Sequence, residues 1–364
     1  MLPAFSRRLG LLSRHFCSSS SRMSYPASMH AITIAKTGGP EVLEKTEIPF
    51  PTVEPEHLVI KIEYAGVNFI DVYFRQGIYS ANKPFPFAIG KEAAGTVVGL
   101  PTDSTVLDDP EYQKRGYKVG SRVAIEHLGA YAEYVAMPWR AAYPVADSIP
   151  VRVAAASLIQ GVTTISFMEE AYTVKEGDIV LIHTIAGGLG TLMCQFAKSR
   201  GAIVIGTTST KEKAEYAKKN GADHVILYKN EDTVARVLEI TNGEGVHAIY
   251  DGVGKDTFDS DFKMIRRKGT LVSVGNASGP VPPFPPLKLV EKNMKLVRPT
   301  MGNYAYTPSE VLYYANALSS HLSDGTLKPS IHKEYPFTAE GVRESHTDLT
   351  SGKTIGKLLI KISD

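Results

Sequence analysis

The chain has 364 residues, enough for two domains with separate cores, and 43% apolar with 21% charged residues is an ordinary globular composition. The formal net charge is only +2, and the two cysteines, Cys17 and Cys194, support neither a disulfide framework nor a Cys-rich zinc site. No apolar run approaches the roughly 20 residues of a membrane span, so we expect a soluble protein without one.

The first 22 residues contain four arginines, several serines and no acid, and the first acid of the chain is Glu41. This composition is typical of a mitochondrial transit peptide, because the apolar stretch is too short and interrupted for a secretory signal. The alternative is a disordered tail, with translation starting at Met23 or Met29. Without these residues the net charge changes from +2 to −2, since four arginines are lost. The basic charge therefore gives no separate argument for nucleic-acid binding.

From Met29 onward, short apolar segments are separated by Gly and Pro and show little helical periodicity, which predicts a β-rich region. Within it, the hydrophilic residues 101–120 predict a surface loop insertion. Asp71 and Arg75 are four residues apart, and a local ion pair is the simplest interpretation of them. After Gly356, the sequence GKLLIKI predicts a strand that returns to the β-rich region.

The segment Ile179–Gly190, IVLIHTIAGGLG, joins a short apolar strand to a Gly turn, and the residues after it predict a helix. This order is typical of a dinucleotide-binding βα unit, in which backbone N–H groups at the helix N-terminus approach a pyrophosphate. The turn is formed by Gly187, Gly188, Leu189 and Gly190. A helix-capping turn in an unrelated α/β protein remains the alternative for this segment alone.

The next predicted strand, from Gly201, ends in hydroxyl and lysine residues where an NAD site usually has an Asp or Glu for the ribose 2′-hydroxyl. Glu212 is the nearby acid, but it falls in a helix start that it would stabilise. We therefore predict NADPH, with its 2′-phosphate held by Ser209, Thr210 and Lys213. A solvated helix face is the alternative for the lysine.

Further apolar runs alternate with helical stretches up to Gly279, which predicts a doubly wound parallel sheet, a Rossmann-type α/β fold. Ligands of such sheets bind at the carboxyl ends of the strands. By this rule four residues that follow predicted strands face the cofactor: Tyr228, Val274, Gly275 and Asn276.

Nine motifs, in one order from Met29 onward, resemble the zinc-free NADPH:quinone oxidoreductases, the zeta-crystallin-like branch of the medium-chain dehydrogenase/reductase superfamily. They read AGVNFIDVYFRQGIY, GKEAAG, GAYAEY, QGVTT, HTIAGGLG, VIGTTSTKEKA, YDGVG, GNASG and RPT. The resemblance implies a GroES-like β-rich catalytic domain at 29–158 and 303–364. It also implies a Rossmann NADPH-binding domain at 159–302. Residues 1–28, which precede both domains, would be a transit peptide or a disordered tail.

The resemblance further implies site residues outside the Gly turn. Asn68, Phe69 and Tyr73 would lie on the nicotinamide side, and Tyr79 would face the substrate; packing of the tyrosines is the alternative. The remaining cofactor contacts that the family pattern implies are Thr163, Thr300, Met301, Gly302 and Lys353.

In the zinc-containing alcohol dehydrogenases of this superfamily, a Cys stands at the position that matches Asn68, and a His at the position that matches Lys91. Neither an amide nor an ammonium is a suitable Zn²⁺ ligand, so we expect no metal. Without a metal to polarise a carbonyl, alcohol chemistry is disfavoured, whereas a quinone is a strong acceptor without such help.

The sequence therefore predicts an NADPH:quinone oxidoreductase, in which the cofactor supplies the electrons and the protein supplies orientation. The alternative enzyme is a mitochondrial-type 2-enoyl-thioester reductase, with Tyr79 as proton donor. The resemblance also implies a homodimer, and it admits a secondary role in binding AU-rich RNA or single-stranded nucleic acid. No basic stripe with interleaved aromatic residues supports that role. The cell compartment would be mitochondrial if the first residues are a transit peptide, and otherwise cytoplasmic.

Overall fold

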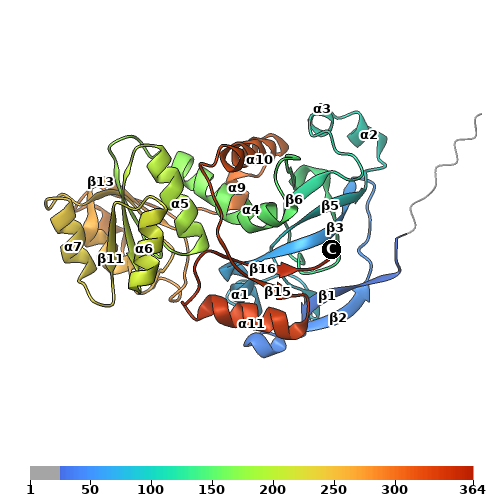
Figure 1. Cartoon of the computed structure of the whole chain (residues 1–364), viewed down its shortest axis with the longest axis horizontal. Helices are drawn as coiled ribbons and strands as arrows, with labels where there is room; N and C mark the ends of the chain where they lie inside the picture. Colours follow the sequence, from blue (N-terminus) through green and yellow to red (C-terminus); the bar gives the residue numbers. More distant parts are fainter. Residues whose placement is uncertain (1–24, 364) are drawn as a thin grey trace, which may run out of the picture.

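The computed structural model describes residues 25–363, and the predicted transit peptide lies outside the described residues. Figure 1 shows two halves side by side, an α/β half that carries β11 and β13 and a β-rich half that carries β3 and β5. The helix α4 lies between them.

The α/β half contains a six-stranded sheet with the order β11-β10-β9-β12-β13-β14, and all of its strand pairs are parallel. Its strands are β9 (Ile179–Ile182), β10 (Ile203–Thr208), β11 (His224–Leu227), β12 (Val246–Asp251), β13 (Ile265–Ser273) and β14 (Lys295–Val297). The chain order reverses between β9 and β12, so this is the switch point at which such sheets bind ligands. The predicted doubly wound fold is confirmed, with β14 as an additional edge strand.

Both faces of this sheet are covered, because neighbouring residues of one strand pack into different cores. In β9, Val180 and Ile182 pack in one cluster with α5 and α6, whereas Leu181 packs in another with α7 and α8. The four helices are α5 (Gly188–Ser199), α6 (Lys211–Lys219), α7 (Thr233–Ile240) and α8 (Phe258–Met264). Cys194 on α5 is a buried core residue.

The β-rich half has a seven-stranded sheet, β15-β16-β3-β5-β6-β8 with β7 also paired to β3, and a three-stranded sheet, β2-β1-β4. The strands of the larger sheet are β3 (His57–Val67), β5 (Glu92–Gly99), β6 (Arg122–Glu126), β7 (Tyr134–Pro138), β8 (Ala142–Pro144), β15 (Ile331–Pro336) and β16 (Lys357–Lys361). Those of the smaller sheet are β1 (Ser28–Ile34), β2 (Glu44–Pro49) and β4 (Phe87–Ala88). The strand predicted after Gly356 is β16, and it returns to pair with β3.

The remaining helices border or connect the sheets, and α11 packs against β15 and β16. They are α1 (Phe69–Gln76), α2 (Ser104–Leu107), α3 (Pro110–Gln113), α4 (Val151–Ser166), α9 (Met301–Tyr304), α10 (Pro308–Ser323) and α11 (Ala339–Thr350). Three short 3-10 turns are η1 (Pro40–Val42), η2 (Trp139–Ala141) and η4 (Pro286–Leu289), and η3 (Phe167–Ala171) is a π-helical turn.

The segment 101–120, predicted as a surface loop insertion, lies largely at the surface, but it is not loop throughout. The segment forms α2 and α3, and Tyr112 packs edge-on against Trp139 in the core of the β-rich half. The buried guanidinium of Arg115 donates hydrogen bonds to the carbonyls of Ala142 and Pro308. The polar composition hid these contacts, because only a few apolar side chains attach the segment to the core.

One stretch of helix, Val151–Ala171, is long and apolar enough to cross a membrane by composition alone, which the sequence analysis did not expect. In the protein it is a core helix, and 78% of its most apolar window is buried. The predicted domain boundary at 158/159 falls within α4, and the boundary at 302/303 falls within α9. The helix α4 packs against β3, β5 and β6 of the β-rich half and against α5 of the α/β half.

Candidate active site

The Gly turn after β9 leads directly into α5, whose N-cap residue is Gly187. A glycine offers no side chain to cap the helix, so the first N–H groups of α5 can serve an anion. Gly190 permits close packing, because a Cβ there would lie 2.5 Å from the Thr184 carbonyl oxygen. Thr184 itself has φ +54°, a strained conformation for a β-branched residue. Gly188 and Leu189 lie in the first turn of α5, both half-buried.

The predicted 2′-phosphate contacts lie together at the carboxyl end of β10 and the start of α6. Thr210 is the N-cap of α6, where its hydroxyl accepts a hydrogen bond from the Lys213 backbone N–H, and Ser209 precedes it. The Lys213 ammonium reaches the carbonyl oxygen of Gly352 at 2.7 Å, and burial lowers its pKa. Glu212 occupies the first turn of α6, as expected for an acid that stabilises the helix N-terminus.

Asp251, the last residue of β12, organises the segment that follows β13. Its carbonyl oxygen accepts hydrogen bonds from the N–H groups of Val274 at 2.6 Å and Gly275 at 3.1 Å. Asn276, the next residue, donates its backbone N–H to the hydroxyl of Tyr73 at 3.2 Å. Tyr228 follows β11, one strand beyond β10 on the side away from the switch point, and its side chain is half exposed.

Three aromatic rings on and after α1 gather opposite this segment. The rings of Tyr73 and Tyr79 meet edge-on at 5.3 Å, and Phe69 lies 6.3 Å from Tyr73. Burial raises the pKa of Tyr73, so its hydroxyl stays protonated at neutral pH. The surface formed by these rings can stack and hydrogen-bond a planar substrate without titrating.

The predicted ion pair between Asp71 and Arg75 is absent from the described contacts of these two residues, so that interpretation is wrong. Asp71 accepts hydrogen bonds from the backbone N–H of Asn68, the N-cap residue of α1, and from the Tyr131 hydroxyl. Arg75 instead bonds the Gly38 carbonyl oxygen and the His346 ring. Both side chains are buried, and each is hydrogen-bonded to residues that are distant in the chain instead of to the other.

Asn68 is tied into a buried group of polar side chains. Its amide nitrogen donates to Glu92 at 2.8 Å and to the Gly66 carbonyl, and its amide oxygen accepts from the Lys357 ammonium at 2.7 Å. Lys357 also pairs with Glu92 at 2.6 Å, and both are almost fully buried. The polar atoms of Asn68 thus point toward this ion pair, and the residue braces the start of α1.

The position that holds zinc in the metal-containing relatives does not fit a metal here. Asn68 offers an amide that is already bonded, and Lys91 pairs its ammonium with Glu126 at 3.0 Å. Zinc sites use thiolate, imidazole or carboxylate ligands, and a cationic lysine at this point repels a divalent ion. The donor chemistry of these two residues therefore does not fit a zinc ion.

The remaining predicted contacts lie on three segments around the site. Thr163 is buried on α4, Thr300 is the exposed N-cap of α9, and Met301 is buried in its first turn. The Cα of Gly302 faces Glu126, since a Cβ there would lie 3.7 Å from the Glu126 carboxylate. Lys353 is exposed in the turn before β16.

Arg298 is a candidate site residue that was not predicted from the sequence. Its guanidinium donates to the carbonyl oxygens of Ser273 and Val274 at 2.8 and 2.6 Å, and it reaches the Tyr79 hydroxyl at 3.4 Å. It is thus a cation beside the aromatic rings. Arg298 is the first residue of the RPT motif. However, β14 has only 3 residues, so the sequence did not indicate where this strand ends and did not place Arg298 at the site.

Comparisons with known proteins agree with this architecture. A family model described as an alcohol dehydrogenase GroES-like domain matches residues 54–147, and one described as a zinc-binding dehydrogenase matches residues 188–317. The fold and site therefore define an oxidoreductase of the medium-chain dehydrogenase/reductase superfamily.

Relatives narrow this class. A quinone oxidoreductase of Pseudomonas aeruginosa is 36% identical over 332 residues, which cover 90% of this chain and 98% of the relative. The structure of Escherichia coli quinone oxidoreductase complexed with NADPH has a TM-score of 0.84 at 33% identity, covering 91% of this chain and 99% of that one. A mycobacterial protein complexed with NADPH has a TM-score of 0.85 at 38% identity, covering 92% and 100%. The chain belongs to the quinone oxidoreductase family.

Proposed function

We propose that the protein reduces quinones with NADPH and without a metal. The observation that carries the proposal is the surface of Phe69, Tyr73 and Tyr79 opposite the carboxyl edge of the cofactor sheet, with the cation Arg298 at its border. When bound, the cofactor supplies the hydride. The aromatic rings orient the planar acceptor, and Arg298 stabilises the negative charge that develops on its oxygen.

NADPH is proposed over NADH because of the residues after β10. Ser209, Thr210 and Lys213 offer two hydroxyls and an ammonium, whereas Glu212, the nearby acid, sits in the first turn of α6. A 2′-phosphate gains charge-assisted hydrogen bonds from such a set. The relatives whose structures contain NADPH support the same choice.

The test is a steady-state assay of NADPH and NADH oxidation with a panel of small ortho- and para-quinones. We expect turnover with NADPH and at least one quinone class, and slower turnover with NADH. Turnover of a crotonyl thioester but of no quinone would instead establish the enoyl-thioester reductase. Binding of AU-rich RNA at physiological salt, competed by NADPH, is the measurement for the nucleic-acid role, which no described feature favours.

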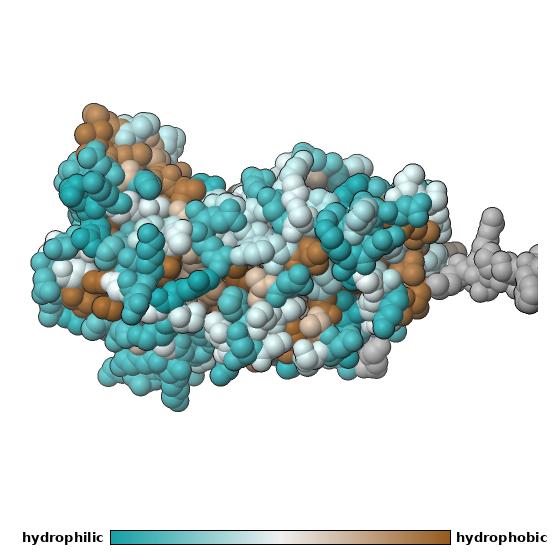
Figure 2. All heavy atoms as spheres, turned by 90° about the horizontal axis from the view of Figure 1, so that it is seen from above, coloured by the Kyte–Doolittle hydropathy of each residue, from teal (hydrophilic) through white to brown (hydrophobic). Residues whose placement is uncertain are grey.

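We also propose a homodimer formed through the cofactor sheets. β14 is the edge strand of the six-stranded sheet, and Leu287 and Val290, in the segment that leads into it, are 76% and 62% exposed. Figure 2 shows hydrophobic surface on a projection at the end of the molecule formed by the α/β half. Large exposed apolar residues next to an open strand edge favour pairing with a second copy. Light scattering after size-exclusion chromatography tests this, and a Leu287→Glu/Val290→Glu variant should be monomeric.

For localisation we propose mitochondrial import, which rests on the arginine-rich and acid-free composition of residues 1–22 alone. Fusion of residues 1–28 to a fluorescent protein is the test. A diffuse signal would contradict import.

A further inference from the structure

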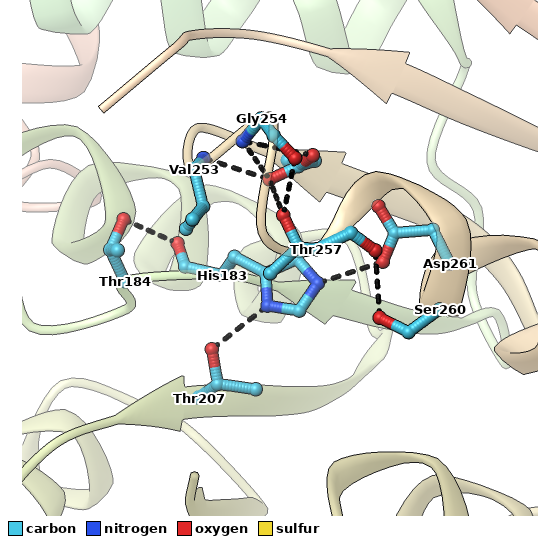
Figure 3. Close-up of polar contacts among 9 residues, drawn as sticks. His183, Thr184, Thr207, Val253, Gly254, Thr257, Ser260 and Asp261 are labelled. Atoms are coloured by element: carbon cyan, nitrogen blue, oxygen red, sulfur yellow. Dashed lines mark hydrogen bonds and ion pairs between the residues drawn. The ribbon is translucent and has the colours of Figure 1, made fainter. Parts of the chain in front are cut away.

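A buried polar cluster lies beneath the switch point between β9 and β12, and the proposed chemistry does not use it (Figure 3). His183 immediately follows β9, Asp251 ends β12 and Asp261 lies on α8. All three are less than 5% exposed. One ligand-type atom from each lies within 4.8 Å of the others.

The hydrogen bonds of the cluster form two adjacent groups, one around His183 and one around the Asp251 carboxylate, which together we call the network (Figure 3). The two ring nitrogens of His183 contact Asp261 at 2.9 Å and the Thr207 hydroxyl at 2.9 Å. The carboxyl groups of Asp261 and Asp251 also lie close together, with one oxygen of each within 4.8 Å of the other. Two buried carboxyl groups this close repel each other when both are ionised, so a proton held between them stabilises the cluster. The second Asp261 oxygen is buried and has no partner among the described residues, which also favours the protonated form of this carboxyl group.

The network holds the two segments between which a dinucleotide would bind. His183 is followed by Thr184, which begins the Gly turn and donates its hydroxyl to the His183 carbonyl oxygen at 2.7 Å. The Asp251 carboxylate accepts the N–H groups of Val253 at 2.8 Å and Gly254 at 3.2 Å. It also accepts the Thr257 hydroxyl at 2.9 Å.

We propose that His183, Asp261 and Asp251 are positioning residues that share protons and hold the Gly turn and the loop after β12 in the arrangement that NADPH binding requires. The inference rests on the proposed function, because it assumes NADPH at this edge of the sheet. All three side chains are of kinds that bind metals. Their contacts, however, have the pattern of hydrogen bonds to each other, to a threonine hydroxyl and to backbone N–H groups.

The network responds to pH in one direction. Burial raises the pKa of Asp261 to about 6, and Asp261 and Asp251 raise the pKa of His183 against the effect of its burial. The facing groups from the other packed elements are the neutral hydroxyls of Thr207 and Thr257. As the pH rises, the network loses protons and becomes more negative. Buried charge is poorly screened, so NADPH, which is anionic, should bind less tightly.

The test is a fluorescence titration that measures the Kd of NADPH for wild type, Asp261→Ala and Asp261→Asn. Asp261→Ala leaves His183 without its acceptor, and we expect a roughly tenfold higher Kd, the cost of one unsatisfied buried polar group. In Asp261→Asn the amide can accept from His183 and donate to Asp251, so the Kd at neutral pH should return to within about threefold of wild type. Asp259→Ala, an exposed position on the same helix, is the matched control and should leave the Kd unchanged.

The pH dependence separates proton sharing from a merely structural role. The ratio of the wild-type Kd to the Asp261→Asn Kd should fall as the pH is lowered from about 8 to about 5.5, because only wild type gains protons on the pair. Titration of the cofactor's own phosphate cancels in this ratio.

Three results would overturn the inference. They are an unchanged Kd in folded Asp261→Ala, a ratio that does not vary with pH, or one equivalent of metal that co-purifies with wild type and is lost from Asp261→Ala. If Asp261→Ala does not fold, Asp261→Asn and the pH ratio decide alone. Because the readout is binding, a protein that binds NADPH yet reduces no quinone contradicts only the proposed function.

Discussion

The hydroxyl of Tyr73 accepts a hydrogen bond from the backbone N–H of Asn276 at 3.2 Å, which connects α1 of the β-rich half to the segment after β13 of the α/β half. This bond fixes how the aromatic surface faces the cofactor sheet.

Tyr73→Phe should therefore raise the KM for NADPH by roughly tenfold, because the Asn276 N–H loses its partner in a mostly buried position. The control is Tyr117→Phe, which removes a buried hydrogen bond to Ala142 in the β-rich half. Both variants should lose thermal stability, but Tyr73→Phe alone should change the KM. Equal KM values in the two variants would contradict a role for the bond between the halves.

Lys213→Ala should raise the KM for NADPH by about tenfold, because it removes a partly exposed charge-assisted hydrogen bond to the 2′-phosphate. It should leave the KM for NADH unchanged, because NADH has no 2′-phosphate. Lys211→Ala, at the exposed start of the same helix, is the control. Parallel changes in the two KM values would instead indicate that Lys213 acts through its contact with Gly352.

Tyr79→Phe distinguishes the two enzyme hypotheses. If Tyr79 orients a quinone, loss of its hydroxyl should lower kcat/KM for quinones by roughly 2- to 10-fold, as for a neutral hydrogen bond. A loss of about a thousandfold or more, with a matching change in the pH profile, would assign Tyr79 as a general acid.

Lys357→Met should destabilise the protein by about 3–5 kcal/mol, since the Glu92 carboxylate is left buried without its cation. The double variant Glu92→Gln/Lys357→Met should recover most of this loss. Lys218→Met breaks the exposed pair with Glu215 and should cost less than about 1 kcal/mol. Urea unfolding at pH 7 measures the free energy of unfolding of the three variants. If Lys357→Met were as stable as wild type, the ion pair with Glu92 would contribute little.

The stability should also depend on pH through His346, whose pKa is lowered to about 3 by burial. Below about pH 6.5 the unfolded chain binds a proton that the folded protein does not, so the free energy of unfolding falls by up to about 1.4 kcal/mol per pH unit. The variant His346→Gln does not show this loss. The difference in the free energy of unfolding between wild type and this variant should therefore narrow as the pH is lowered from 7 to 5. Asp71, whose pKa burial raises to about 6, acts in the opposite sense in both proteins and cancels. A constant difference would contradict a buried neutral His346.

The α/β half was predictable because its signals are local. The strand and Gly turn at Ile179–Gly190 and the hydroxyls after β10 lie within a few residues of one another. The interpretation of Asp71 and Arg75 as a pair failed because their real partners, Tyr131 and His346, lie 60 and 271 residues away in the chain. The bonding of Asn68 to Lys357 spans 289 residues and could not be predicted for the same reason.

The last strand, β16, and the turn before it connect the two halves of the molecule. The turn before β16 contacts the Gly turn, where the Gly356 N–H donates to the Ala186 carbonyl oxygen at 3.2 Å, and β16 then pairs with β3. A chain cut after α11 would therefore lose Lys357, expose an edge of β3 and leave the start of α5 without this support. The two halves cannot be prepared as separate fragments by a single cut, because residues 356–361 belong to the seven-stranded sheet and contact the Gly turn of the α/β half.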